Sequence, residues 1–311
     1  MLSRLETALC LGREVFDAEL QDVTVLEVEK TRPILPVPRT LRILALHGFG
    51  QSGECLRIAM KTGQLGQMVL DSINADLLDQ YENVEWLCPD APLQLVPDTR
   101  YEDGSLDNVD IFAWWRVLDF DMQHEHLYKS LTYLAGYLKE HDPVDGIVGF
   151  SQGAAVAMML AAMCDDTPQR RAALLAQCAP FSIPPPQAPF KFAVACCGFQ
   201  NALQHYSGFY TPRITTPSLN IVAEFDTMVS AEQSVTLARA CTESTMIHFR
   251  GTHHVPTARA TLREMAAFIA SSCARKAFMS PPTATYTLPF ECMEAKEFST
   301  THRFETTKKP S

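Results

Sequence analysis

The residues Gly149-Phe150-Ser151-Gln152-Gly153 are the most informative part of this chain about its fold. It follows an apolar run at 145–149 that is typical of a buried strand, and it precedes an alanine-rich run at 154–162 that is typical of a helix. A serine at a tight strand-to-helix turn has a strained backbone that projects its hydroxyl outward, and the flanking glycines avoid collisions with neighbouring backbone. The pattern therefore predicts a nucleophile elbow at Ser151. A glycine-rich helix start that the serine caps is the simpler alternative.

Strand-like and helix-like runs alternate along the chain on both sides of this turn. The strand candidates span 41–46, 84–88, 146–150, 192–197, 219–223 and 245–249. The helix candidates span 62–79, 124–141, 152–164, 169–178, 231–242 and 257–275. Continuous apolar strands that alternate with helices predict an α/β fold, in which helices cover both faces of a mostly parallel central sheet.

The repeating pattern predicts one α/β domain over residues 40–278, with an extension on each side. Residues 1–39 are predicted to be an N-terminal extension that packs on the domain. Residues 279–311 are rich in threonine, proline and charge, and we expect a disordered or loosely packed tail. Inside the domain, 90–121 and 180–216 lack periodicity, which favours irregular lid or insertion loops.

Bulk composition excludes several classes of protein. The 311 residues carry a formal net charge of −10 without a basic stripe, which argues against nucleic-acid binding. No apolar run approaches the length of about 18 residues that a membrane span requires. The first 30 residues lack the apolar core of a signal peptide, so we expect a cytoplasmic protein.

The spacing of the cysteines predicts no metal site, and the sequence contains no motif that would predict a cofactor. The ten cysteines are scattered, and none forms a C-x-x-C pair or pairs with histidines at zinc spacing. The adjacent Cys196 and Cys197 are expected on opposite faces of a strand. Phosphate-binding and dinucleotide-binding glycine motifs are absent from the sequence, so no nucleotide cofactor is indicated.

A serine nucleophile needs a base to accept its proton and an acid to orient that base. The loop after the 219–223 strand contains Glu224 and Asp226, and the loop after the next strand contains His253 and His254. Both loops follow the carboxyl ends of strands, the edge where α/β sheets place their sites. We favour Asp226 because Glu224 directly continues the strand. The pattern leaves the two histidines open, since adjacent side chains point in different directions.

The oxyanion of the tetrahedral intermediate needs two backbone N–H donors. The stretch 47–53, His-Gly-Phe-Gly-Gln-Ser-Gly, follows the first strand of the domain and is similar to an oxyanion loop, although a simple tight turn would also explain it. We expect the amides of Phe49 and Gln152 to be the donors. Phe49, Trp114 and Trp115 are candidates for a substrate pocket, and the two tryptophans fit the core equally well.

Taken together, these residues resemble the fungal-type serine hydrolase (FSH) family of the α/β-hydrolases. The matching stretches, in family order, are 43–49, 61–63, 89–92, 113–115, 149–153, 226–229 and 253–256. The family pattern Gly-Gly-His-x-Val-Pro maps onto 251–256 and favours His253 as the base. Thr252 replaces the second glycine of that pattern, and Gly50 stands where family members usually have a larger residue.

The resemblance implies an esterase or thioesterase that uses Ser151, Asp226 and His253. Some members are similar to stand-alone thioesterases of fungal polyketide clusters, such as that of the lovastatin pathway, which cleave a product from the acyl-carrier domain of a synthase. We therefore expect an acyl thioester as substrate, a polyketide synthase carrier domain as partner, and a role in secondary metabolism. The alternatives are a carboxylesterase acting on small free esters and a non-catalytic hydrolase-fold module that binds a ligand.

Overall fold

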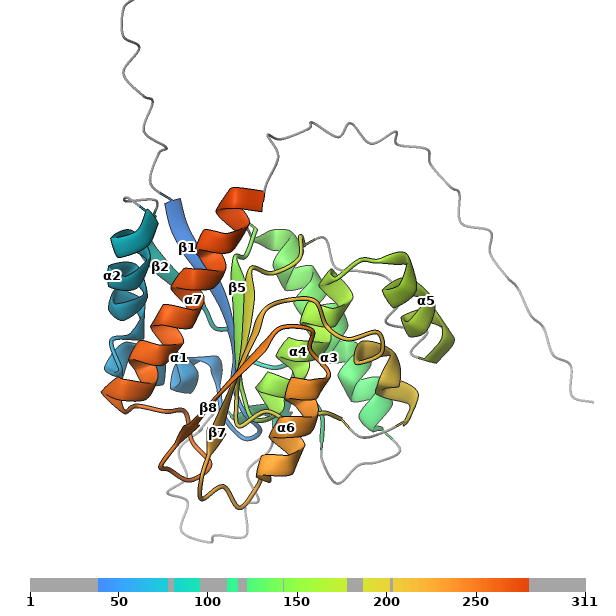
Figure 1. The fold of residues 1–311 in the computed structure, drawn as a ribbon. Coiled ribbons are helices and arrows are strands. Elements are labelled where there is room, and N and C mark those ends of the chain that lie inside the picture. Colours follow the sequence, from blue (N-terminus) through green and yellow to red (C-terminus); the bar gives the residue numbers. More distant parts are fainter. Residues whose placement is uncertain are drawn as a thin grey trace, which may run out of the picture. The chain divides into compact units, whose positions relative to one another are not determined.

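A computed structural model of the chain describes residues 39–77, 81–95, 111–116, 122–141, 143–177, 187–201 and 204–279 (Figure 1). The predicted N-terminal extension up to residue 38 and the predicted tail from residue 280 lie outside these residues. The same holds for most of the 90–121 segment and for part of the 180–216 segment, so the predicted lid or insertion loops are described only in part.

Six parallel strands form the central sheet, as the sequence predicts. Their order across the sheet is β2-β1-β5-β6-β7-β8, and every neighbouring pair is parallel. The bounds are Arg39–Leu46 for β1, Tyr81–Leu87 for β2, Gly146–Phe150 for β5, Phe192–Cys196 for β6, Ser218–Ala223 for β7 and Ser244–Phe249 for β8. The strand order reverses between β1 and β5. Ligands bind at such a switch point in open α/β sheets, beyond the carboxyl ends of the strands.

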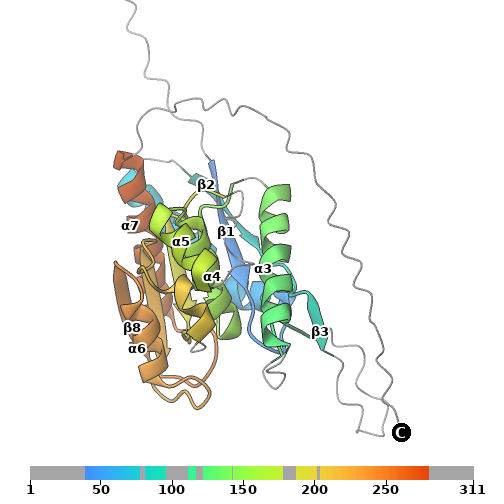
Figure 2. The ribbon, with the colours of Figure 1, turned by 90° about the vertical axis from the view of Figure 1, so that its right-hand side faces the viewer.

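Helices cover both faces of this sheet, and Figure 2 shows α7 and α3 on opposite sides of it. One face carries α1 (Gly53–Thr62), α2 (Leu65–Leu77) and α7 (Arg259–Met279). The other carries α3 (Gln123–Glu140), α4 (Gln152–Cys164), α5 (Pro168–Gln177) and α6 (Ala231–Arg239), with a short 3₁₀ helix at Gln204–Phe209.

Alternation along the strands divides the apolar core into two clusters. In β1, Leu44 and Leu46 join the cluster beneath α4, while Ile43 and Ala45 join the cluster beneath α7. All four side chains are fully buried. A strand that is buried on both faces is apolar throughout, which explains the continuous apolar runs in the sequence.

The helix predicted over 62–79 corresponds to α2, which spans Leu65–Leu77, and a separate helix α1 over Gly53–Thr62 precedes it. The chain turns at Gly63 and Gln64, where Gln64 has a φ of 53°, and α2 begins at Leu65. The preceding helix α1 starts after Ser52, whose hydroxyl accepts a hydrogen bond from the Cys55 amide. This helix was not predicted, although Ser52 marks its start, and a distant carboxylate also supports its first turn: Asp90 accepts a 2.7 Å hydrogen bond from the first amide of the helix.

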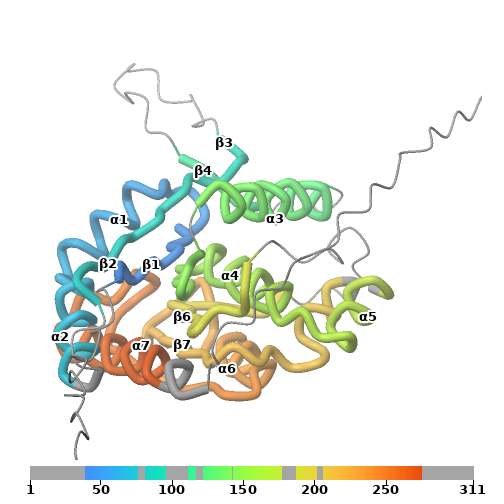
Figure 3. The backbone as a smooth tube through the Cα atoms, turned by 90° about the horizontal axis from the view of Figure 1, so that it is seen from above, coloured from blue at the N-terminus to red at the C-terminus, as the bar shows by residue number. Residues whose placement is uncertain are grey.

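A small antiparallel hairpin lies within the segment that showed no periodicity. It pairs β3 (Leu93–Leu95) with β4 (Ile111–Ala113), and Figure 3 shows it beside α3. Three residues are too few to display an alternating pattern, so the sequence could not reveal these strands. Among the helices of the described ranges, none has the length and apolarity to cross a membrane.

Candidate active site

Ser151 occupies the strained turn between β5 and α4 that the sequence predicts. Its backbone has φ 51° and ψ −117°, a conformation that residues other than glycine rarely adopt. A Cβ atom at Gly153 would collide with the Leu46 and His47 carbonyl oxygens, and one at Gly149 would lie only 2.5 Å from the Ala154 Cα. Gly153 therefore allows α4 to start directly against the end of β1, and Gly149 allows the strand end to lie against the first turn of α4.

Three side chains from separate strand ends meet at this turn. The Ser151 Oγ lies 2.8 Å from His253 Nε2, and His253 Nδ1 lies 2.7 Å from Asp226 Oδ2. The Asp226 side chain is 3% exposed and that of His253 is 18% exposed. The structure thus brings together the three predicted residues, in the order nucleophile, base and orienting acid.

The Asp226 carboxylate is fixed by the backbone of its own loop. Its Oδ1 accepts hydrogen bonds from the amides of Met228 at 2.8 Å and Val229 at 2.9 Å. Burial alone would raise the pKa of Asp226, but the hydrogen bonds from His253 and these amides outweigh it and lower the pKa. Glu224, the alternative acid, instead faces Arg250 at 3.8 Å on the surface.

The two adjacent histidines have different contacts in the structure. The His253 ring packs near Phe150 with ring centroids 5.0 Å apart, which places it over the elbow. The His254 ring stands edge-on to Phe249 at 5.2 Å, and its Nδ1 lies 3.5 Å from the Thr252 hydroxyl. Only His253 reaches the nucleophile, in agreement with the family pattern.

The predicted oxyanion loop is oriented by the buried ring of His47. The Ala91 amide donates to His47 Nε2 at 3.0 Å, so the ring proton must be on Nδ1, which donates to the Gly48 carbonyl oxygen at 2.7 Å. In a trans peptide the N–H points opposite to the C=O, so the Phe49 amide points away from this ring. Burial lowers the pKa of His47, in keeping with the neutral ring.

The other predicted donor, the amide of Gln152, is the first of α4. The first N–H groups of a helix have no partner within it and form the positive end of its dipole. The Gln152 side chain, whose role the sequence did not reveal, accepts from the Trp114 amide and donates to the Trp115 carbonyl oxygen, both at 2.8 Å. These two hydrogen bonds connect the turn at Ser151 to the residues that follow β4.

The three pocket candidates occupy different environments. Trp114 is fully buried, and its indole N–H donates to the His47 carbonyl oxygen at 2.8 Å. Trp115 is also buried, with its ring edge toward Phe199. Phe49 is 47% exposed. Trp114 therefore supports the oxyanion loop from the core, whereas Phe49 is accessible from solvent.

Gly50, the departure from the family pattern in this loop, has a φ of +68°, a value that favours glycine. Its amide donates to the Phe112 carbonyl oxygen at 2.9 Å, and the Phe112 amide donates to the Gln51 carbonyl oxygen at 2.8 Å. The turn at this glycine thus allows the oxyanion loop to pair with β4.

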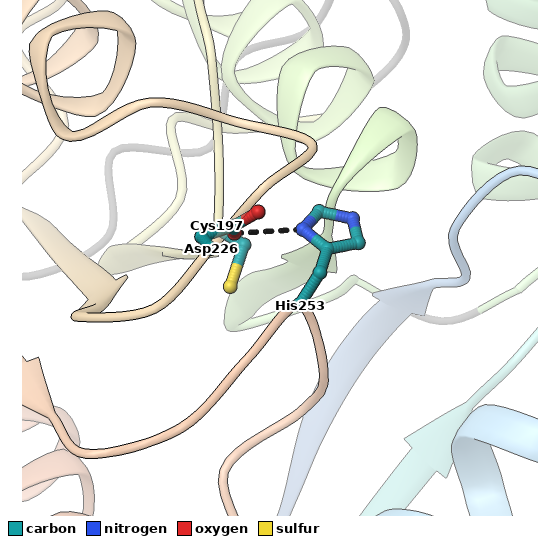
Figure 4. A group of neighbouring side chains, drawn as sticks. All are labelled: Cys197, Asp226 and His253. Atoms are coloured by element: carbon teal, nitrogen blue, oxygen red, sulfur yellow. Dashed lines mark hydrogen bonds and ion pairs between the residues drawn. The ribbon is translucent and has the colours of Figure 1, made fainter.

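Cys197 lies beside the Asp226–His253 pair, which the sequence did not predict (Figure 4). Its φ of +48° breaks the strand alternation, so it packs in the same core cluster as Cys196 and not on the opposite face as expected. The thiol donates a long hydrogen bond of 3.9 Å to the His254 carbonyl oxygen. Burial and the charge of Asp226 raise the pKa of Cys197 to about 12, so the thiol stays protonated.

A Ser-His-Asp relay beside an oxyanion-type loop, at the carboxyl edge of a parallel sheet, defines the serine hydrolases of the α/β-hydrolase class. A family model described as serine hydrolase (FSH1) matches residues 37–265 of the chain. The chain belongs to this serine hydrolase family.

Individual relatives agree with this membership. A hydrolase of Schizosaccharomyces pombe, described as uncharacterized, is 29% identical over 240 residues, which are 73% of this chain and 50% of that protein. The chain thus spans about half the length of this relative. Esterase OVCA2 of Xenopus tropicalis is 30% identical over 231 residues, covering 70% of this chain and 87% of the esterase.

Among solved structures, acyl-protein thioesterase 2 of Zea mays superposes with a TM-score of 0.50 at 18% identity. The superposition covers 76% of this chain and 96% of the thioesterase. At this identity the likeness supports the α/β-hydrolase fold alone.

Proposed function

We propose that this chain hydrolyses acyl esters or thioesters through a covalent acyl-enzyme. The observation that carries the proposal is the unbroken hydrogen-bonded chain from Asp226 through His253 to Ser151. Ser151 Oγ attacks the acyl carbonyl while His253 Nε2 accepts its proton and then delivers it to the leaving thiol or alcohol. His253 next activates a water molecule, which releases the acid and restores the free serine.

Asp226 holds the proton of His253 on Nδ1, so that Nε2 is free to accept the serine proton. The same carboxylate stabilises the imidazolium that forms during each transfer. The amides of Phe49 and Gln152 stabilise the oxyanion of each tetrahedral intermediate. Losing one such donor typically costs about 3–4 kcal/mol of transition-state stabilisation.

For the substrate, we propose a polyketide or related acyl chain held as a thioester on the carrier domain of a synthase, in secondary metabolism. The resemblance to polyketide-releasing thioesterases, including that of the lovastatin pathway, supports this choice. A second support is the exposed apolar side chains next to the site. Phe49 lies in the oxyanion loop, and Phe225 and Met228 flank Asp226. Exposed apolar side chains of this size suit contact with an acyl chain.

The test of the mechanism compares the wild type with Ser151→Ala on an activated ester. We expect the variant to fold normally and to lose turnover by roughly 10⁴-fold or more, because the nucleophile is gone. Circular dichroism and the midpoint of thermal unfolding provide the folding control. Wild-type turnover in the variant would exclude the mechanism. Failure of the wild type to react with a fluorophosphonate would favour the non-catalytic binding module.

The test of the substrate compares two forms of one acyl group. The wild type is incubated with an acyl-loaded carrier domain and, separately, with a small free ester of the same acid. Release from the carrier at the higher kcat/KM supports the thioesterase proposal. Preference for the free ester would assign the chain as a carboxylesterase, the alternative that the name of the Xenopus tropicalis relative favours.

A further inference from the structure

We propose that Cys197, Asp226 and His253 form an inhibitory binding site for a borderline-soft divalent cation, with Zn²⁺ and Cd²⁺ as the probes. Within the described part of the chain, these three residues each present a ligand atom, and the atoms lie within 4.8 Å of one another. The set combines a sulfur, an imidazole nitrogen and a carboxylate oxygen. Zinc and cadmium accept this mixture, whereas magnesium and calcium prefer oxygen ligands alone.

The geometry needs only small movements to accept the ion. Metal–ligand bonds of about 2.0–2.3 Å in a tetrahedral site place the ligand atoms roughly 3–4 Å apart. His253 Nδ1 and Asp226 Oδ2 are 2.7 Å apart and must separate slightly, while the Cys197 sulfur must approach them (Figure 4). His253 is partly exposed, which provides a route for the ion from solvent.

Bonds already present would support the ligands from behind. Asp226 is held through Oδ1 by two backbone amides, which leaves Oδ2 available to the metal. A histidine that ligates a metal usually donates its other ring N–H to an oxygen acceptor. Ser151 Oγ stands 2.8 Å from His253 Nε2 and fits that role.

Charge also balances at this site. Binding releases the thiol proton of Cys197 to solvent, and the resulting thiolate and the Asp226 carboxylate together neutralise the two positive charges of the ion. The imidazole stays neutral because its proton moves from Nδ1 to Nε2. A neutral set of groups avoids most of the cost of burying an uncompensated charge.

The same proton movement explains the inhibition, and this step rests on the proposed function. With the metal on Nδ1, His253 Nε2 carries a proton and donates to Ser151 instead of accepting from it. The ring can then no longer act as the general base. Removing the metal returns the proton to Nδ1, so the inhibition is reversible.

The first experiment measures turnover of an activated ester against increasing Zn²⁺ or Cd²⁺ in a buffer without thiols or chelators. We expect inhibition that EDTA reverses, with Mg²⁺ as a cation control that has no effect. Cys197→Ala removes a direct ligand and should weaken inhibition by at least the roughly 10- to 100-fold typical of losing an outer-shell partner. Inhibition is expressed relative to the metal-free rate of each variant.

The matched control is Cys55→Ala, because Cys55 is an exposed free cysteine. We expect this variant to be inhibited like the wild type. Equal inhibition of the wild type and Cys197→Ala would place the metal elsewhere and overturn the proposal. Absence of inhibition in the wild type would overturn it as well.

A second experiment is independent of catalysis. Cadmium added to Ser151→Ala should produce the ultraviolet charge-transfer absorption of a cadmium–thiolate bond, and adding Cys197→Ala to that background should abolish it. Absorption that persists in the double variant would contradict the site. If the absorption depends on Cys197 but the wild type has no esterase activity, the metal site stands and the proposed function fails.

Discussion

At the scale of single residues, the two adjacent histidines are the sharpest test of the site. His253→Ala should lower kcat on an activated ester by roughly 10³-fold or more, because His253 Nε2, unlike the His254 ring, contacts the serine hydroxyl. His254→Ala should change kcat by less than about ten-fold, since its ring packs on Phe249. Steady-state kinetics on both purified variants gives the comparison. Greater loss in the His254 variant would reverse the assignment.

The buried ring of His47 predicts a pH dependence of stability. Burial lowers its pKa in the folded state, despite opposing contributions from Gly48 and Asp90, below the value of about 6.5 expected for the unfolded chain. As the pH falls, the unfolded chain takes up this proton first. The contribution of His47 to stability is therefore fully present above about pH 6.5 and is lost as the pH falls toward the folded-state pKa.

Urea unfolding of the wild type and of His47→Gln at a series of pH values measures this contribution. We expect the free energy of unfolding of the wild type to fall more steeply than that of the variant between about pH 7 and pH 5. The difference in slope isolates His47 from the other histidines. Parallel curves would show that the ring is protonated as easily in the folded protein as in the unfolded chain.

The two candidate acids, Glu224 and Asp226, differ in their position relative to the preceding strand. The position of Asp226 in the turn was enough to favour it, because a residue that continues a strand follows the direction of that strand. The choice between His253 and His254 needed the family pattern, since residues alone left it open. Ring packing over Phe150 then separated them in the structure.

At the scale of elements, the elbow depends on how closely α4 approaches β1. In Gly153→Ala the new methyl group would collide with the backbone oxygens of Leu46 and His47, at the base of the oxyanion loop. We expect a loss of about 1–3 kcal/mol in the free energy of unfolding, as in other overpacked sites, together with a fall in kcat. Denaturant unfolding and ester kinetics measure the two effects.

Gly136→Ala is the matched control, because Gly136 lies in α3 with open space around its Cβ position. Alanine there should stabilise the protein by about 0.5–1 kcal/mol, since it lowers the entropy cost of forming the helix. Its kcat should equal that of the wild type. Equal effects of the two substitutions would show that close packing at the elbow contributes neither to the free energy of unfolding nor to kcat.

Some of the helices and strands could be predicted from the sequence and others could not. All six sheet strands were predicted, and the inner strands β5 and β6 are buried at every position and apolar throughout, whereas the edge strands β2 and β8 are partly exposed. Helix α1 and the β3–β4 hairpin were missed. The first turn of α1 donates a hydrogen bond to the distant Asp90, a contact that the sequence cannot show, and the hairpin has only three residues in each strand.

At the scale of the whole domain, a buried ion pair links the end of α4 to later segments. Asp165 and Arg170 face each other at 3.6 Å with side chains that are 1% exposed. Asp165 also accepts from the amide and hydroxyl of Thr215, and Arg170 donates to the Gly208 and Phe209 carbonyl oxygens. Asp165→Asn should lower the free energy of unfolding by about 3–5 kcal/mol, because it removes the carboxylate that balances a buried guanidinium.

The neighbouring surface pair provides the control for this prediction. Asp166 and Arg171 are 3.1 Å apart but about half exposed. Asp166→Asn should change the free energy of unfolding by less than about 1 kcal/mol, because solvent screens the pair. Denaturant unfolding of both variants gives the comparison. A similar small loss in both would mean that the buried pair does not link these segments.

The fold class, the nucleophile and the strand ends that supply its partners could all be predicted from the amino-acid sequence. These features are encoded locally: apolar runs specify the strands, and two glycines permit the turn at Ser151. The tertiary structure alone shows that His47 orients the oxyanion loop, that the Gln152 side chain connects the elbow to the end of β4, and that Cys197 lies beside Asp226. Each of these contacts joins groups that are far apart in the chain and meet only in the folded protein: His47 after β1 meets Ala91 after β2, Gln152 after β5 meets Trp114 after β4, and Cys197 after β6 meets Asp226 after β7.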